Sequence, residues 1–203
     1  MADYDPLNVQ AITWLQTSTW QPTEGDPNTT YYLLERYALA SLYFSTNGAS
    51  SWAQSDNWVS PDQPVCNWFA KGTNDCSGPL TNLNLGANGL QGSLPPVIFA
   101  LTALTYLDLS ANQLTGRIPE TIGNLGENNM QELKLQANLL TGSIPASIAN
   151  LKSLEWLYLQ DNQLTGSIPA LPFIDFACYL DDNCFQDVSN AASGNCRVHD
   201  NCI

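Results

Sequence analysis

The chain has 203 residues and carries 19 acidic against 6 basic side chains, which gives a formal net charge of −13. A negative charge of this size argues against nucleic acid or an anionic membrane surface as a partner. No run of about 18 apolar residues is present, so the sequence predicts no segment that inserts directly into a membrane.

Residues 1–79 are predicted to form an N-terminal capping domain built from helices. Apolar residues recur at helical spacing in Leu7–Trp20 and again in Thr29–Gly48. In the second helix Thr29 or Thr30 can cap the start, and Asn47-Gly48 is a typical end. The stretch ahead of the first helix, MADYDPLN, is not a signal peptide.

Five of the six tryptophans lie before residue 80. Such large rings in a cap are predicted to fill its core rather than to form a sugar-binding platform. They are Trp14, Trp20, Trp52, Trp58 and Trp68.

Four copies of the pattern L-x-L-x-x-N-x-L-x-G-x-(I/L)-P define a second region, residues 80–172. The copies are Leu83–Pro95, Leu107–Pro119, Leu133–Pro145 and Leu157–Pro169. Their asparagines are separated by 24, 26 and 24 residues, a period typical of a leucine-rich repeat solenoid. The alternating leucines put two apolar side chains on one face of a short strand. The asparagine amide can bond the backbone of the following turn, and the glycine allows backbone conformations closed to other residues.

These repeats resemble the plant-specific subclass of leucine-rich repeats, whose mark is L-x-G-x-I-P after the asparagine. The resemblance covers Leu80–Pro169. It implies an α/β solenoid, a short right-handed superhelix with parallel strands on the concave face and short helical turns outside. Gly123–Leu133 holds two extra residues, which are expected to bulge on the convex side without shifting the strand register. The segment Trp52–Cys76 resembles the N-terminal caps of secreted and receptor-like plant repeat proteins, and more closely those of diatoms.

Residues 173–203 are predicted to form a degenerate fifth repeat and a cysteine-rich C-terminal cap. Cys178 occupies the place of an inward leucine, and Asn183 falls in the asparagine position. A solenoid needs such a cap because its last repeat would otherwise expose its leucines to water.

All six cysteines lie in the two predicted caps, which indicates disulfides formed in an oxidising compartment. They are Cys66, Cys76, Cys178, Cys184, Cys196 and Cys202. Cys66 is expected to pair with Cys76, whereas the last four allow three pairings that the sequence does not separate. Zinc held by the C-terminal cysteines with His199 is a weaker alternative, because the C-x5-C spacing differs from that of structural zinc sites.

The expected location is therefore extracellular or at the cell surface. The chain would be an ectodomain whose leader has been removed, within a protein that can carry further segments. Asn28-Thr29-Thr30 is a sequon in a polar loop, so Asn28 is a predicted glycosylation site.

No catalytic site is predicted. His199 lies beside Asp200 among cysteines, with no nucleophile positioned for it. A calcium site at Asp181, Asp182, Asn183 and Asp187 would lack the alternating ligands and closing glutamate of a calcium loop. The sequence therefore predicts no enzyme, no bound metal and no cofactor.

The variable positions of the strands are the candidate binding residues, because every other motif position has a structural role. Parallel strands stack such positions into rows about 4.8 Å apart. The predicted binding residues on the concave face are Tyr106, Asp108, Glu132, Lys134, Trp156, Tyr158, Tyr179 and Asp181. Trp156, Tyr158 and Tyr179 are expected to be neighbours, and exposed tryptophan and tyrosine are enriched at interface hot spots. Acidic neighbours would favour a basic partner.

Three functions are compatible with this pattern. The first is a non-catalytic extracellular module that binds a protein or peptide, as a receptor-like ectodomain or in cell-surface adhesion. A short array suits a small protein contact, a co-receptor role or homotypic association. The second is a cell-wall inhibitor or carbohydrate-binding protein similar to the polygalacturonase inhibitors, whose acidic substrate this face would repel. The third is ice binding, which needs a more regular polar row than these strands offer.

Overall fold

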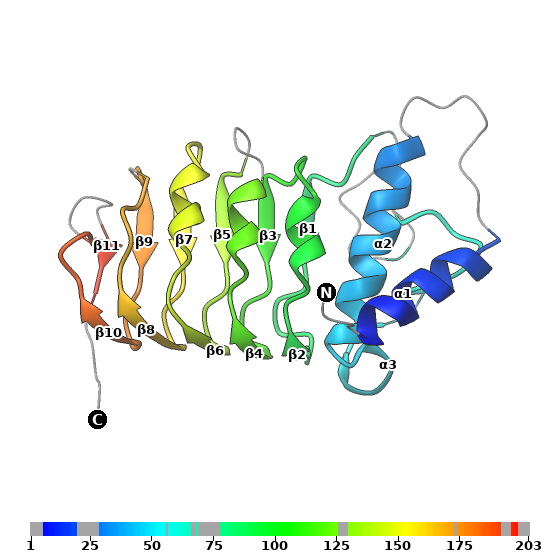
Figure 1. The fold of residues 1–203 in the computed structure, drawn as a ribbon, viewed down its shortest axis with the longest axis horizontal. Helices are drawn as coiled ribbons and strands as arrows, with labels where there is room; N and C mark the ends of the chain where they lie inside the picture. The colour runs from blue at the N-terminus through cyan, green and yellow to red at the C-terminus, as the bar shows by residue number, and fades with distance from the viewer. Residues whose placement is uncertain are drawn as a thin grey trace.

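A computed structural model of the chain describes residues 6–19, 29–55, 57–65, 68, 78–125, 130–172, 174–191 and 196–198. Helices gather at the N-terminal end, and a ladder of short strands leads away from them to the C-terminal end (Figure 1). The helices are α1 (Pro6–Thr17), α2 (Thr29–Ser45) and α3 (Gly48–Ser51). Asn47 follows α2 with a left-handed φ of 60°, close to the end that the sequence predicts.

The strands form two parallel sheets. In the six-stranded sheet the order is β1-β3-β5-β7-β9-β11, and in the five-stranded sheet it is β10-β8-β6-β4-β2. The first sheet contains β1 (Asn82–Asn84), β3 (Tyr106–Asp108), β5 (Glu132–Lys134), β7 (Trp156–Tyr158), β9 (Ala177–Tyr179) and β11 (Cys196–Arg197). The second contains β2 (Gln91–Ser93), β4 (Gln113–Arg117), β6 (Leu139–Gly142), β8 (Gln163–Ser167) and β10 (Cys184–Asp187).

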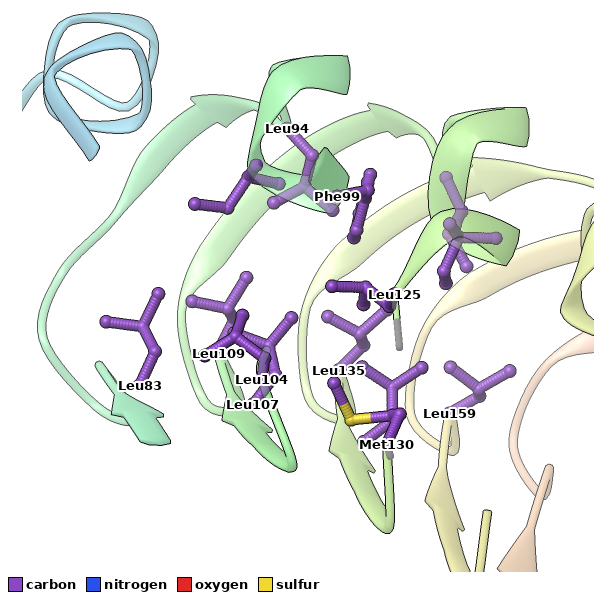
Figure 2. Packing of buried hydrophobic residues seen from close by; sticks show 14 of the residues in the cluster. Leu83, Leu94, Phe99, Leu104, Leu107, Leu109, Leu125, Met130, Leu135 and Leu159 are labelled. Carbon is purple, nitrogen blue, oxygen red and sulfur yellow. The ribbon is translucent and has the colours of Figure 1, made fainter. Parts of the chain in front are cut away.

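A short 3-10 helix follows the proline of each of the first three copies. These helices are η2 (Pro96–Ala100), η3 (Glu120–Asn124) and η4 (Ala146–Asn150). Motif leucines such as Leu107, Leu109 and Leu135 are fully buried, and Figure 2 shows them between the strands and the 3-10 helices. The predicted leucine-rich repeat solenoid is therefore confirmed. The division of the chain at residues 79/80 and 172/173 stays a prediction, since one hydrophobic core runs from Ala38 to Ala191.

The longer second interval leaves the strand register unchanged, as predicted. Leu107 pairs with Leu133 across the 26-residue step, just as Leu83 pairs with Leu107 across a 24-residue step. Of the stretch that holds the two extra residues, 126–129 lie outside the described residues. The expected bulge of those residues stays a prediction.

The motif asparagines form a buried ladder that ties each repeat to its neighbours. Asn138 is 6% exposed, and its Nδ2 donates to the carbonyl oxygens of Leu109 and Leu135 at 3.0 and 3.1 Å. Its Oδ1 accepts the backbone N–H of Leu114 at 3.0 Å. Asn88, Asn112, Asn162 and Asn183 are buried at the equivalent positions. The ladder satisfies backbone groups that the turn leaves without a partner inside the core.

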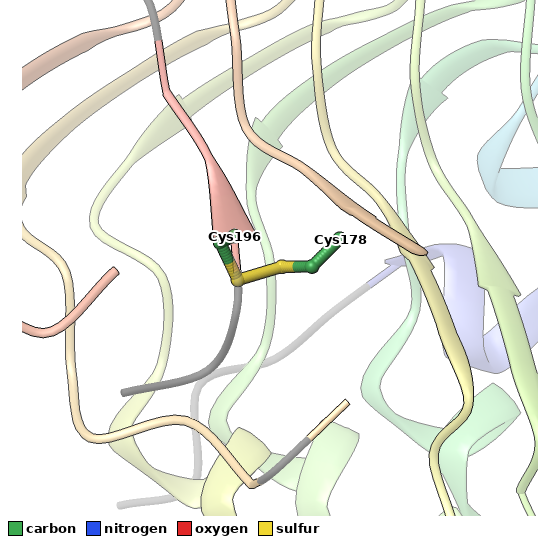
Figure 3. The surroundings of a disulfide bond; sticks show 2 residues. All are labelled: Cys178 and Cys196. Atoms are coloured by element: carbon green, nitrogen blue, oxygen red, sulfur yellow. A yellow bond between two sulfur atoms is a disulfide. The ribbon is translucent and has the colours of Figure 1, made fainter. Parts of the chain in front are cut away.

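The fifth repeat is present, and a disulfide links it covalently to strand β11. Cys178 pairs with Leu157 in the strand register and is buried, as its place in the pattern predicts. It is bonded to Cys196 of β11, with a Cα–Cα distance of 4.4 Å (Figure 3). Among the pairings that the sequence left open, the structure thus contains Cys178–Cys196. Cys184 is also disulfide-bonded.

The N-terminal cap has an aromatic core. Trp52, Trp58 and Trp68 are buried, and the centroids of the Trp52 and Trp58 rings lie 4.6 Å apart. Trp14 packs edge-on to Trp68 at 5.3 Å. The prediction that these rings fill the cap is confirmed for the four described tryptophans, whereas Trp20 lies outside the described residues.

Arg36 is an interior cation that the sequence pattern did not indicate. Its side chain is fully buried, and its guanidinium carbon lies 4.8 Å from the Trp14 ring centroid and 5.2 Å from that of Trp68. It donates hydrogen bonds to the carbonyl oxygen of Gln63 and the hydroxyl of Ser18. Burial lowers the pKa of Arg36 to about 10, which leaves it charged at neutral pH. The aromatic faces and oxygen acceptors offset the loss of hydration.

Glu35 joins the cap to the first repeat. Its buried carboxylate accepts the backbone N–H of Leu80, just before β1. Burial raises the pKa of Glu35, and the hydrogen bond from Leu80 offsets only part of this effect. The raised pKa means that the folded chain holds this proton more tightly than the unfolded chain. The contribution of Glu35 to stability therefore falls as the pH rises from its ordinary pKa of 4.5 through the raised value.

Glu35→Gln is expected to keep the acceptor for Leu80 and to remove the buried charge. The free energy of unfolding of the variant minus that of wild type should increase as the pH rises from about 4.5 to 7. Urea unfolding of both proteins across this range measures the difference. A difference that stays constant or shrinks with rising pH would contradict the role given to Glu35.

Candidate binding surface

The outward-facing side chains of the six-stranded sheet form a surface that we call the strand face. Strand register aligns them in two rows. The first row is Asn82, Tyr106, Glu132, Trp156 and Ala177, and the second is Asn84, Asp108, Lys134, Tyr158, Tyr179 and Arg197. Seven of the eight predicted binding residues thus lie in two adjacent rows, and Asp181 follows β9. The structure brings the predicted set together on one face.

The N-terminal half of the strand face is a network whose charges pair with one another. The Lys134 Nζ lies 2.6 Å from Glu132 Oε1 and 3.4 Å from the Tyr106 hydroxyl. That hydroxyl in turn donates to Asp108 Oδ2 at 3.1 Å. Asp108 is only 9% exposed, and its Oδ1 accepts from the backbone N–H and the hydroxyl of Ser110. These polar groups are already satisfied within the chain.

The pKa values in this half follow from the same contacts. Burial by itself lowers the pKa of Lys134, but hydrogen bonds to Glu132 and Tyr106 outweigh it and raise that pKa to about 12. Burial and the nearby Asp108 carboxylate raise the pKa of Tyr106. Both shifts keep the groups in their ordinary charge states at neutral pH. Lys134 is therefore a cation and Tyr106 a neutral phenol at neutral pH.

The C-terminal half of the strand face carries two aromatic stacks. The rings of Tyr158 and Tyr179 stack with centroids 5.5 Å apart and an interplanar angle of 22°. The Trp156 ring stacks on Phe176 at 4.8 Å and 14°. Phe176 is 65% exposed, which is unusual for a large apolar side chain. Together the four rings form an aromatic surface across β7 and β9.

Phe176 differs from the expected arrangement. The sequence predicts Trp156 beside Tyr158 and Tyr179, but the ring that stacks on Trp156 belongs to Phe176. Ala177, the residue after Phe176, is the register partner of Trp156. Phe176 was missed because the equivalent positions in earlier copies are polar, namely Thr81, Thr105, Gln131 and Glu155. That departure from the repeat is the signal that could have identified it.

Arg197 is the second residue that sequence reasoning missed. It lies in β11 beside Tyr179, and its Nε is 3.5 Å from Asp181 Oδ2. Its side chain is 64% exposed, so this ion pair contributes little to stability. No leucine motif precedes Arg197, and its strand is held in the sheet by parallel pairing with β9 and by the Cys178–Cys196 disulfide.

The remaining predicted sites are placed as follows. Asn28, Cys66, Cys76, Cys202 and His199 lie outside the described residues. Asn183, a ligand of the alternative calcium site, is engaged in the asparagine ladder through Leu164 and Leu159. Within the described ranges, no group of three or more His, Cys, Asp or Glu side chains is arranged to hold a metal ion.

No helix in the described part of the chain has the length and apolar character needed to cross a bilayer.

Comparison with known proteins identifies the repeats. Residues 103–125, 129–151 and 153–173 match the family model for the Leucine Rich Repeat. The chain therefore contains leucine-rich repeats, in agreement with the fold. No curated protein matches the chain.

Among solved structures, the chain is similar to plant receptor ectodomains. It is 26% identical to a chain of the BIR3–SERK2 complex from Arabidopsis thaliana, with a TM-score of 0.60, covering 96% of this chain and 93% of that one. It is 25% identical to the BIR2 ectodomain from the same plant, with a TM-score of 0.56, over 91% and 83% of the two chains.

A longer receptor matches over a shorter stretch. The PEPR1–AtPEP1 structure is 38% identical with a TM-score of 0.53, covering 59% of this chain. The chain spans only 17% of the length of that protein. The plant-type resemblance is thus supported, whereas the narrower resemblance to diatom proteins finds no support in these comparisons.

Proposed function

We propose that this chain is a non-catalytic, extracellular interaction module that binds a protein or peptide through the strand face. The observation that carries the proposal is the aromatic surface of Trp156, Phe176, Tyr158 and Tyr179 on that face. Exposed aromatic side chains bury a large apolar area on binding and are enriched at interface hot spots. The chain's net charge of −13 favours a partner with a basic surface.

The partner proposed is a second ectodomain, in a co-receptor-like or homotypic contact. Support comes from the BIR3–SERK2 complex, whose matched chain is similar over nearly its whole length. The six-stranded sheet is short, so it suits a compact contact better than a long extended ligand. Neither the geometry nor the comparisons adds support for a cell-wall inhibitor, a carbohydrate-binding protein or an ice-binding protein.

An extracellular or cell-surface location fits the chemistry of the C-terminal cap. Cys178–Cys196 is a disulfide, and Cys184 takes part in another. Disulfides form and persist in oxidising compartments. The similar BIR2 structure is an ectodomain, which agrees with this location.

Trp156→Ala combined with Tyr158→Ala is expected to abolish capture of a partner from native cell extract. Both side chains are only half-buried, so the melting temperature should stay within a few degrees of wild type. Immobilised wild type and double variant are compared in the same extract, and bands that depend on the two rings are identified. A double variant that captures the same protein at full strength would rule out the strand face.

A further inference from the structure

Two aromatic stacks lie on the strand face, and only one of them is accompanied by cations of the chain itself. The Lys134 Nζ lies 5.6 Å from the Tyr158 ring centroid, and Arg197 is the register partner of Tyr179. The Trp156–Phe176 stack lacks such a group, since cation–π contacts among the described residues involve only Arg36 and Lys134. The most exposed aromatic surface of the described chain is therefore without a cation.

Two acidic residues adjoin that stack along the chain, since Glu155 precedes Trp156 and Asp175 precedes Phe176. The backbone N–H of Phe176 donates to the carbonyl oxygen of Glu155, so Glu155 is the neighbour of Phe176 on the adjacent repeat. Asp175 precedes Phe176 and is exposed. In the described part of the chain the ion pairs are Lys134–Glu132 and Arg197–Asp181, and neither Glu155 nor Asp175 takes part in one.

An aromatic face beside unpaired carboxylates is complementary to one kind of side chain. A guanidinium group is planar, stacks on an aromatic ring and donates two parallel hydrogen bonds to a carboxylate. An ammonium group lacks the planar surface, and an apolar side chain would leave the carboxylates unpaired. Arg36, held between the Trp14 and Trp68 rings, shows the same stacking inside this molecule.

We propose that the Trp156–Phe176 stack, with Glu155 and Asp175, is the binding site for an arginine side chain of the protein partner. The inference rests on the proposed function and adds the chemistry of the contact. The guanidinium stacks on the exposed face of Phe176 and donates to the two carboxylates. The other half of the strand face has its charges paired within the chain. Its network of Tyr106, Asp108, Glu132 and Lys134 then positions the partner along the strands and does not select the partner's charge.

The test uses a library of random 12-residue peptides displayed on phage and selected on the wild-type chain. Peptides enriched by the selection should share an arginine, and its replacement with citrulline or lysine should weaken binding at least about tenfold. Citrulline keeps the shape of arginine and removes the charge. The same peptides should bind at least about tenfold more weakly to Phe176→Ala and to Glu155→Gln with Asp175→Asn.

A matched control neutralises two acids elsewhere. Glu120→Gln with Asp187→Asn removes the same charge from η3 and β10, so it should leave affinity for the selected peptides within about twofold of wild type. Phe176 is 65% exposed, and its truncation should leave the melting temperature unchanged.

Different results separate this inference from the proposed function. Suppose that the selected peptides no longer bind Trp156→Ala with Tyr158→Ala. If these peptides carry no arginine, or still bind Glu155→Gln with Asp175→Asn, the arginine site alone is overturned. Peptides that bind Trp156→Ala with Tyr158→Ala as well as they bind wild type contradict the proposed function as well. A selection that enriches no peptide would also overturn the arginine site. The same holds if neutral sugars bind wild type and lose that binding in Phe176→Ala.

Discussion

Asn138→Ala is expected to lower the free energy of unfolding by about 3–5 kcal/mol, because it removes one rung of the buried asparagine ladder. The amide of Asn138 bonds the carbonyl oxygens of Leu109, Leu135 and Gln136 and the backbone N–H of Leu114. Alanine leaves the N–H of Leu114 buried without its acceptor, and each such group costs about 1–3 kcal/mol. The lost bonds join two neighbouring repeats, so the whole array should melt earlier.

Urea denaturation of wild type and variant measures this loss, and Asn84→Ala is the matched control. Asn84 is exposed, and its Oδ1 accepts the backbone N–H of Gly86 at 3.1 Å. Its replacement should change the free energy of unfolding by less than about 1 kcal/mol. A loss below about 1 kcal/mol for Asn138→Ala would mean that the ladder does not hold the repeats together.

Gly92→Ala is expected to cost more than about 3 kcal/mol, because it combines an unfavourable backbone conformation with a collision. Gly92 has φ of 128°, a value that residues with a Cβ rarely adopt. An added Cβ would overlap the carbonyl oxygen of Ser45 at the end of α2. The Ser45 carbonyl is a backbone group and cannot rotate away as a side chain could. The N-terminal cap would therefore have to move away from the first repeat.

Gly116→Ala separates the two effects. Gly116 is the equivalent glycine one repeat later, with φ of 77°, and an added Cβ there meets only the Cβ of Ser93, at 3.6 Å. It should cost about 1–2 kcal/mol from conformation alone. Thermal unfolding of the two variants gives the comparison. Equal losses would show that close packing of the cap against the first repeat contributes nothing.

The repeat positions could be predicted from the sequence because each has one physical role in every copy. The leucines of the first sheet fill the interior, and their constant spacing fixes the strand register, so that Tyr106, Glu132 and Trp156 had to align. The asparagine position was still recognisable in the fifth repeat at Asn183 because its ladder contacts are unchanged.

The non-periodic features could not be read from the same pattern. Phe176 stacks on Trp156, a contact that depends on this one pair of neighbouring strands rather than on the repeat. Arg197 lies in a strand that pairs with β9 beside the Cys178–Cys196 disulfide, whose partners are 18 positions apart, and the sequence allowed three pairings. In the cap, the packing of Arg36 between Trp14 and Trp68 joins α1, α2 and a distant loop. Such contacts depend on tertiary structure and leave no periodic signal.

Partner capture by wild type and by Trp156→Ala with Tyr158→Ala, run side by side, tests most directly whether the strand face is the binding surface. Thr121→Ala with Ser147→Ala, which removes two half-buried hydroxyls on η3 and η4, serves as the matched control away from the strand face. We predict that wild type and the control capture the same protein in equal amounts and that the strand-face variant captures none. Full capture by the strand-face variant, or loss of capture by the control, would contradict this account.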